Sequence, residues 1–211
     1  MNVTQLVEMM KFVASEMVKS EPMLTKFDQA IGDGDHGIGM ERGFVAVEEL
    51  LASSPEYADV SEAFKAIGTT MMASMGGASG AIFGTLFRSG AKAIKGEKTL
   101  TTPVLLAFLD AGLEAIYKRG GANPGDKTMI DALVPAIESL RQTQPADFEQ
   151  DLQNAADASY RGMLSTKDMI ATTGKAKTLG ERSLGHPDPG AMSMSLILKF
   201  MADHCNEAVA V

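Results

Sequence analysis

Hydrophobic residues along the chain recur at intervals of three and four positions, the spacing that places side chains on one face of an α-helix. Leu6, Met10, Val13 and Met17 form the first such series. The same spacing marks the stretches 40–51, 60–71, 106–116, 129–140, 148–163 and the residues from about 188 onward. No segment shows the alternation of apolar and polar residues that is typical of a strand. The pattern therefore predicts an all-α protein of about eight amphipathic helices.

Several of the expected helices carry residues that favour helix ends. Asp59 and Glu62 resemble a capping box at the start of one helix. Thr102 is the expected N-cap of another, with Pro103 in its first helical position. Pro135 predicts a bend in the helix that contains it.

Composition and charge limit the classes of function. The chain has 211 residues, of which 45% are hydrophobic, so one domain spanning residues 1–211 is expected. The net charge of −8, with no cluster of basic residues, argues against nucleic acid as the main partner. No apolar run is long enough to cross a membrane, and charged residues interrupt the first twenty positions. A single cysteine, Cys205, favours a reducing, cytoplasmic setting.

The segment DQAIGDGDHG, residues 28–37, carries three carboxylates within eight positions: Asp28, Asp33 and Asp35. Their mutual repulsion would destabilise an ordinary loop, and a divalent cation that prefers oxygen ligands removes it. Aspartates also serve as helix caps and turn residues, which is the alternative interpretation. Three acids are more than capping needs, so the sequence favours a magnesium site.

Three common loop motifs do not fit the chain. An EF-hand starting at Asp33 would require glycine at Ile38 and glutamate at Phe44. Residues 32–37 match the pattern G-x-G-x-x-G, but no strand precedes them and two aspartates would face the pyrophosphate. No segment matches the Walker A pattern G-x-x-x-x-G-K-[ST].

Glycines concentrate in four interhelical segments. GGASG, residues 76–80, could present backbone N–H groups and the Ser79 hydroxyl to an anion, or form a tight helix–helix turn. Residues 120–129 either contact a ligand or cap a helix. The long stretch 171–190 holds Lys175, Lys177 and Arg182, which can meet phosphate or pair with nearby acids. Antiparallel helices bring alternate connections to one end, so a site assembled there from several loops is expected.

Four motifs in this order, D-x-x-x-x-D-x-D-H-G, GGASG, GDKTM-x-DAL and LGERS-x-GH-x-DPGA, resemble the nucleotide-binding L subunit of dihydroxyacetone kinases. The same domain occurs at the C-terminus of ATP-dependent dihydroxyacetone kinases. The resemblance covers almost the whole chain. It implies an eight-helix antiparallel barrel that binds ADP or ATP and two Mg²⁺ ions in the loops at one end.

The resemblance also implies the residues of the site. Asp28, Asp33 and Asp35 correspond to the magnesium ligands. The implied nucleotide contacts are His36, Gly37, Ile38, Gly39, Gly77, Ala78, Ser79, Gly120, Gly121, Met129, Lys175, Asp188, Pro189 and Gly190. Gly34 stands where many members have alanine, and Lys175 stands where arginine is usual, so a point charge replaces a bidentate group. The DHG sequence favours the dihydroxyacetone branch over fatty-acid kinases.

In function, the resemblance implies a phosphotransferase subunit that is active only with a partner. It would pass a phosphoryl group from bound ATP to dihydroxyacetone, or a related keto-sugar, held on a separate K subunit. The donor is either an M-type phosphohistidine protein or exchanging ATP. Two alternatives stay open: a nucleotide-sensing module that binds a transcription regulator, and the L subunit of an erythrulose-type kinase. A homodimer is compatible with the sequence.

Overall fold

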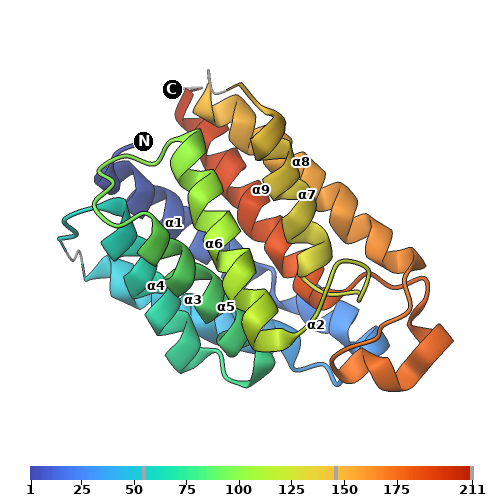
Figure 1. The fold of residues 1–211 in the computed structure, drawn as a ribbon. Helices are drawn as coiled ribbons and strands as arrows, with labels where there is room; N and C mark the ends of the chain where they lie inside the picture. Colours follow the sequence, from blue (N-terminus) through green and yellow to red (C-terminus); the bar gives the residue numbers. More distant parts are fainter. Residues whose placement is uncertain (54–55, 145–146, 210–211) are drawn as a thin grey trace.

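The computed structural model describes residues 1–53, 56–144 and 147–209, and this part of the chain is all-α, with one isolated β-bridge and no strand (Figure 1). The α-helices are α1 (Val3–Lys19), α2 (Glu21–Ile31), α3 (His36–Ala52), α4 (Val60–Ser74), α5 (Gly77–Ala93), α6 (Thr102–Gly120), α7 (Ile130–Gln142), α8 (Phe148–Ser165) and α9 (Pro189–Val209). Two 3₁₀ segments, η1 (Thr166–Asp168) and η2 (Lys175–Ser183), lie between α8 and α9. The predicted all-α class is confirmed.

Eight of these helices pack side by side in a closed ring. Each contacts the next in the order α1, α3, α4, α5, α6, α7, α8 and α9, and α9 returns to α1. The helix α2 lies outside the ring order and packs against α3, α9 and η2. The expected eight-helix barrel is therefore present, with α2 added at one end. The sequence pattern did not separate α2 because its buried face, Leu24, Asp28 and Ile31, includes a carboxylate.

Close helix contacts depend on small residues at particular positions. A Cβ added to Gly90 of α5 would lie 2.5 Å from the Phe108 carbonyl oxygen, and one added to Gly112 of α6 would lie 2.5 Å from Leu86 Cδ1. Larger residues at either position would therefore push α5 and α6 apart. Inside the ring, Phe64 stacks on Phe108 with ring centroids 4.4 Å apart. This dense interior fixes the helix ends on which the loops are mounted.

Of the two predicted helix N-caps, one is confirmed and one is wrong. The Asp59 side chain accepts from the Glu62 N–H at 2.8 Å, as a capping box requires, but Glu62 reaches back to Ala58 instead of the N-cap residue. The prediction for Thr102 is wrong, because Thr101 is the N-cap and α6 begins at Thr102. The Thr102 hydroxyl donates to the buried Asp151 carboxylate at 2.6 Å, which ties α6 to α8.

The connections that hold the sequence motifs meet at one end of the barrel, and the two termini lie at the other end (Figure 1). These connections are 32–35, 75–76, 121–129 and 169–188. The stretch 171–190, expected as a loop, contains the 3₁₀ segment η2. Among the described residues, no helix combines the length and the apolar character needed to cross a membrane.

Candidate functional site

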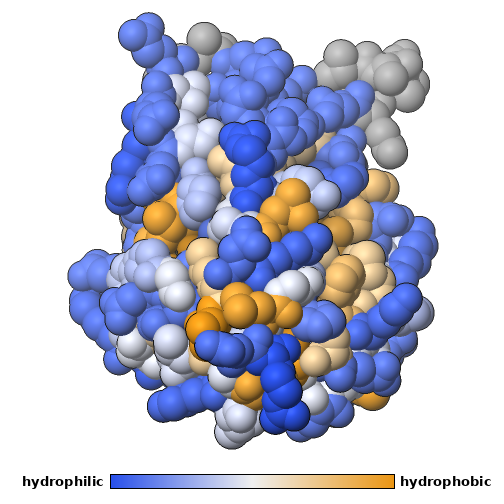
Figure 2. All heavy atoms as spheres, turned by 90° about the vertical axis from the view of Figure 1, so that its right-hand side faces the viewer, coloured by the Kyte–Doolittle hydropathy of each residue, from blue (hydrophilic) through white to orange (hydrophobic). Residues whose placement is uncertain are grey.

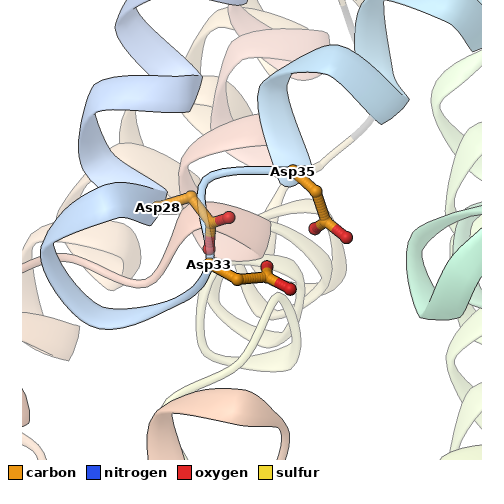
Figure 3. Close-up of side chains that lie close together, drawn as sticks. All are labelled: Asp28, Asp33 and Asp35. Carbon is orange, nitrogen blue, oxygen red and sulfur yellow. The ribbon is translucent and has the colours of Figure 1, made fainter.

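Three carboxylates converge between α2 and α3. Asp28 is a buried residue of α2, and Asp33 and Asp35 belong to the exposed turn that follows it. One carboxylate oxygen from each lies within 4.8 Å of the others, and Figure 3 shows the side chains directed toward a common space. A Cβ added to Gly32 would lie 2.1 Å from Asp28 Oδ1, so a larger residue there would displace the Asp28 carboxylate. These oxygens suit a hard divalent cation.

A lysine from the far end of the sequence faces these acids. Lys175, the first residue of η2, places its Nζ atom 2.9 Å from Asp35 Oδ2 and in contact with Asp33 Oδ2. The hydrogen bond from Lys175 is the main reason that the pKa of Asp33 is lowered, and the two acids raise the pKa of Lys175. The carboxylates are thus already arranged to hold positive charge. Lys175, which was expected to contact the nucleotide, therefore lies directly beside two of the three expected metal ligands.

The GGASG segment starts α5 beside the acids. Gly76 and Gly77 have φ values of 73° and 57°, a left-handed conformation that glycine adopts without strain. The first N–H groups of a helix have no intrahelical partner and can bind an anion. Arg42 holds this turn in place, because its Nε atom donates to the Ser74 carbonyl at 2.7 Å and its Nη2 atom to the Met75 carbonyl. Arg42 was not among the expected site residues; it lies one helical turn after Ile38 on the same face of α3.

His36 connects three helices at the centre of the site. Its Nδ1 atom lies 3.1 Å from Ser79 Oγ on α5, and its Nε2 atom lies 2.8 Å from Ser193 Oγ on α9. Burial lowers the pKa of His36, and the charges of Asp28 and Asp35 oppose that effect. Its backbone N–H donates to Asp28 Oδ2 at 3.1 Å. Ser193 was not expected, because the largely apolar stretch 191–198 contains two serines, Ser193 and Ser195, and the sequence does not distinguish them.

Two adjoining cavities open among these groups. The first, of about 490 Å³, is lined by Asp28, Asp35, Arg42, Lys175 and the GGAS turn. The second, of about 290 Å³, has an apolar side formed by Ile82, Phe83, Ile116 and Met129. Both are bounded by His36, Ala78, Ser79, Thr128, Thr173, Gly174, Asp188 and Gly190. A polar compartment beside an apolar one fits a charged tail joined to a flat ring system.

The structure brings most of the expected site residues together. Those on the cavity walls are Asp28, Asp35, His36, Ile38, Gly39, Gly77, Ala78, Ser79, Gly120, Met129, Lys175, Asp188, Pro189 and Gly190. Asp33 joins through the carboxylate cluster. Gly37 and Gly121 line neither cavity, and their nucleotide contacts stay a prediction. Gly37 packs on α2, where an added Cβ would lie 2.3 Å from Thr25 Oγ1, and Gly121 is the left-handed C-cap of α6.

A buried lysine organises the segment that carries Lys175. Lys127 is 2% exposed, and its ammonium donates to the carbonyl oxygens of Thr166, Met169 and His186 at 2.5, 3.2 and 2.6 Å. Burial lowers its pKa, and nearby acids, first among them Asp188, oppose that effect. From the sequence, the GDKTM motif was expected to form a turn and a helix cap or to contact a ligand. The structure shows that its lysine, Lys127, also anchors residues 166–186.

Asp188 gives the site a pH-dependent contribution to stability. Its Oδ2 atom accepts from the Ala191 N–H at 2.7 Å at the start of α9, and burial raises its pKa to about 7 from 3.8. Because the folded-state pKa is the higher one, folding takes up a proton between about pH 4 and pH 7. The free energy of unfolding contributed by Asp188 therefore falls as pH rises through this window.

The variant Asp188→Asn keeps an oxygen acceptor for Ala191 and cannot ionise. We expect its free energy of unfolding to fall less between pH 5 and pH 7.5 than that of the native chain, measured by urea denaturation. The variant Asp203→Asn, at an exposed ion pair with Lys199, should retain the native pH dependence. Identical pH dependence in the native chain and Asp188→Asn would contradict this assignment.

The chain is similar to several known proteins. A family model described as the DAK2 domain matches residues 30–203. A Listeria innocua protein, "PEP-dependent dihydroxyacetone kinase 1, ADP-binding subunit DhaL", is 43% identical over 183 residues, covering 87% of each chain. The Escherichia coli DhaL subunit is 38% identical, covering 94% of this chain and 95% of its own. The dihydroxyacetone kinase of C. freundii, crystallised with AMP-PNP and Mg²⁺, superposes with a TM-score of 0.74 at 29% identity, over 93% of this chain and 33% of its own.

Proposed function

Because the chain belongs to the DAK2 domain family, we propose that it is the ADP-binding, phosphoryl-transferring subunit of a dihydroxyacetone kinase, with residues 1–211 acting as one L-type nucleotide-binding domain. The observation that carries this proposal is the convergence of three carboxylates on the edge of a two-part cavity. The family resemblance read from the motifs is confirmed by the family model and by the DhaL relatives.

In this proposal, Asp28, Asp33 and Asp35 hold Mg²⁺, and the apolar compartment around Phe83 and Met129 holds the adenine. Bound Mg²⁺ supplies neutralisation of charge on the phosphate oxygens. The first N–H groups of α5, fixed by Arg42, bind and orient the phosphates through fixed dipoles. Lys175 is placed to add a positive charge beside them, since it already lies against the acids.

The sugar is proposed to be held by a separate K-type subunit. This chain matches nearly the full length of the DhaL relatives but only one third of the C. freundii kinase chain. The other two thirds of that kinase have no counterpart here, so we place the sugar site on a separate subunit. Ile170 and Leu184, which flank η2, are 43% and 40% exposed. Figure 2 shows apolar side chains gathered among polar ones on the side of the molecule that carries η2. Exposed apolar groups near a site favour a protein partner.

Purified chain tests the proposal directly. We expect mass spectrometry of the denatured protein to release an adenine nucleotide, and added Mg-ADP to raise the melting temperature of the nucleotide-free chain in a way that EDTA reverses. Phosphorylation of dihydroxyacetone should appear only after a K-type subunit is added with either ATP or a phosphohistidine donor. Repeating the assay with erythrulose in place of dihydroxyacetone shows which of the two sugars is phosphorylated faster. Absence of both bound nucleotide and a thermal shift would contradict the proposal.

A further inference from the structure

A third cavity, of about 650 Å³, runs along the outside of α4 and α5 and reaches α6. Five basic side chains line it, and together they define what we term the basic groove: Lys65, Arg88, Lys92, Lys95 and Arg119. Its walls share no residue with either cavity of the nucleotide site. The groove is thus a separate feature of the surface, on helices that lie next to one another in the ring (Figure 1).

The positive charge of the groove is not neutralised within the described part of the chain. None of its five basic side chains lies within 4.0 Å of a described carboxylate. The two acids in its wall accept from backbone N–H groups instead: Asp59 from Gly96 and Glu62 from Ala58, at 3.0 and 2.9 Å. In a chain of net charge −8, a groove with a local positive excess stands out.

The groove is not built as a pocket for a small anion. Its basic side chains are exposed, and Arg88 alone among them has a described polar contact, to the Met72 sulfur at 3.3 Å. The hydroxyls of Ser61 and Thr85 donate to the carbonyls of Ala91 and Ala81. A tight small-anion site needs donors that are already held in position. Exposed, movable cations instead favour a broad acidic surface.

We propose that the basic groove docks an acidic segment of a protein partner. The stems of the lysines and the Met72 side chain supply apolar contact, and the cations supply long-range attraction. Along α5 the groove extends to Lys92, about 22 Å along the helix axis from Gly77 at the nucleotide end. At α6 it reaches Arg119, which directly precedes Gly120 of the nucleotide cavity. A partner held by the groove would therefore lie beside the nucleotide site without covering the residues that line it. The proposal is independent of the nucleotide chemistry.

A fluorescent peptide of ten glutamates tests the groove by anisotropy with the full chain. We expect saturable binding at 20 mM NaCl that weakens about tenfold or more at 300 mM NaCl. The triple variant Lys65→Gln/Arg88→Gln/Lys92→Gln should bind the peptide about tenfold more weakly. The matched control Lys11→Gln/Lys19→Gln/Lys199→Gln changes net charge equally at ion-paired lysines outside the groove and should bind as the native chain does.

Three results would overturn the proposal. Equal losses in the groove variant and the control would show that binding follows net charge alone. Tighter binding of tripolyphosphate than of the peptide, lost in the groove variant, would show a small-anion site. Tighter binding of a DNA duplex of similar charge would show a nucleic-acid surface. Because each measurement uses the chain without added nucleotide, failure here leaves the proposed function standing.

Discussion

Replacing Asp33 with asparagine is expected to lower the affinity of the chain for Mg-ADP by about 100-fold or more. Asp33 contributes a charged oxygen to the carboxylate cluster, and an amide oxygen is a weaker ligand for a hard cation. Its side chain is exposed and its described partner is Lys175, so the fold does not depend on it. The melting temperature of the metal-free chain should therefore stay close to the native value. Titration calorimetry with Mg-ADP gives the affinity.

The matched control for this prediction is Asp203→Asn. Asp203 is also a partly exposed carboxylate paired with a lysine, but it lies on α9 away from the cluster. It should bind Mg-ADP as the native chain does. Asp28 is a poorer choice for the test, because it also accepts from the His36 N–H and its loss would disturb the start of α3. Unchanged affinity in Asp33→Asn would refute the magnesium site.

Replacing Lys127 with methionine is expected to destabilise the fold by about 3 kcal/mol. The ammonium of Lys127 satisfies three carbonyl oxygens in the segment 166–186, and a thioether satisfies none of them. Methionine has a similar length, so lost packing contributes little. Urea denaturation measures the change, and hydrogen exchange should show its largest increase in residues 166–186.

Nucleotide binding should weaken along with stability in this variant, because Lys175 lies in this segment and the Asp188 N–H, just after it, donates to the Thr166 hydroxyl at 2.9 Å. The control is Lys167→Met in η1, whose backbone carbonyl accepts from Gly185 at 2.8 Å while its side chain has no described ion pair. That variant should unfold within about 0.5 kcal/mol of the native chain. An equal loss of stability in both variants would contradict the anchoring role of Lys127.

Much of the fold was predictable because it depends on local pattern. Three- and four-residue spacing identified seven of the eight ring helices, since each of these buries one continuous apolar face. It did not identify α5, whose sequence is interrupted by Gly80, Gly84 and Gly90 and which was expected only as the helix that follows GGASG. The helix α2 escaped because Asp28 stands in the middle of its buried face. Thr102 was misplaced because a threonine beside another threonine does not reveal which hydroxyl is needed elsewhere, here by Asp151. The segment 171–190 gave no periodicity because 3₁₀ turns follow a different spacing.

The site residues likewise fall into those that local sequence motifs indicated and those that depend on contacts between distant segments. The aspartates, the glycine turns and Lys175 were identifiable because carboxylates, small residues and cations in short motifs limit the chemistry that can occur. Arg42, Lys127 and Ser193 were not, because each acts through carbonyls or side chains far away in the sequence.

The sequence alone therefore determined the helical class and the family, and it supplied Asp28, Asp33, Asp35 and Lys175 as the candidate charged groups of the site. Only the tertiary structure decided which groups hold those residues and that Lys175 lies against Asp33 and Asp35. It alone also showed that five basic side chains, none ion-paired to a described carboxylate, line one groove. The reason is that helix formation and residue chemistry are local properties, whereas a hydrogen bond or an ion pair across the barrel depends on how distant helices pack.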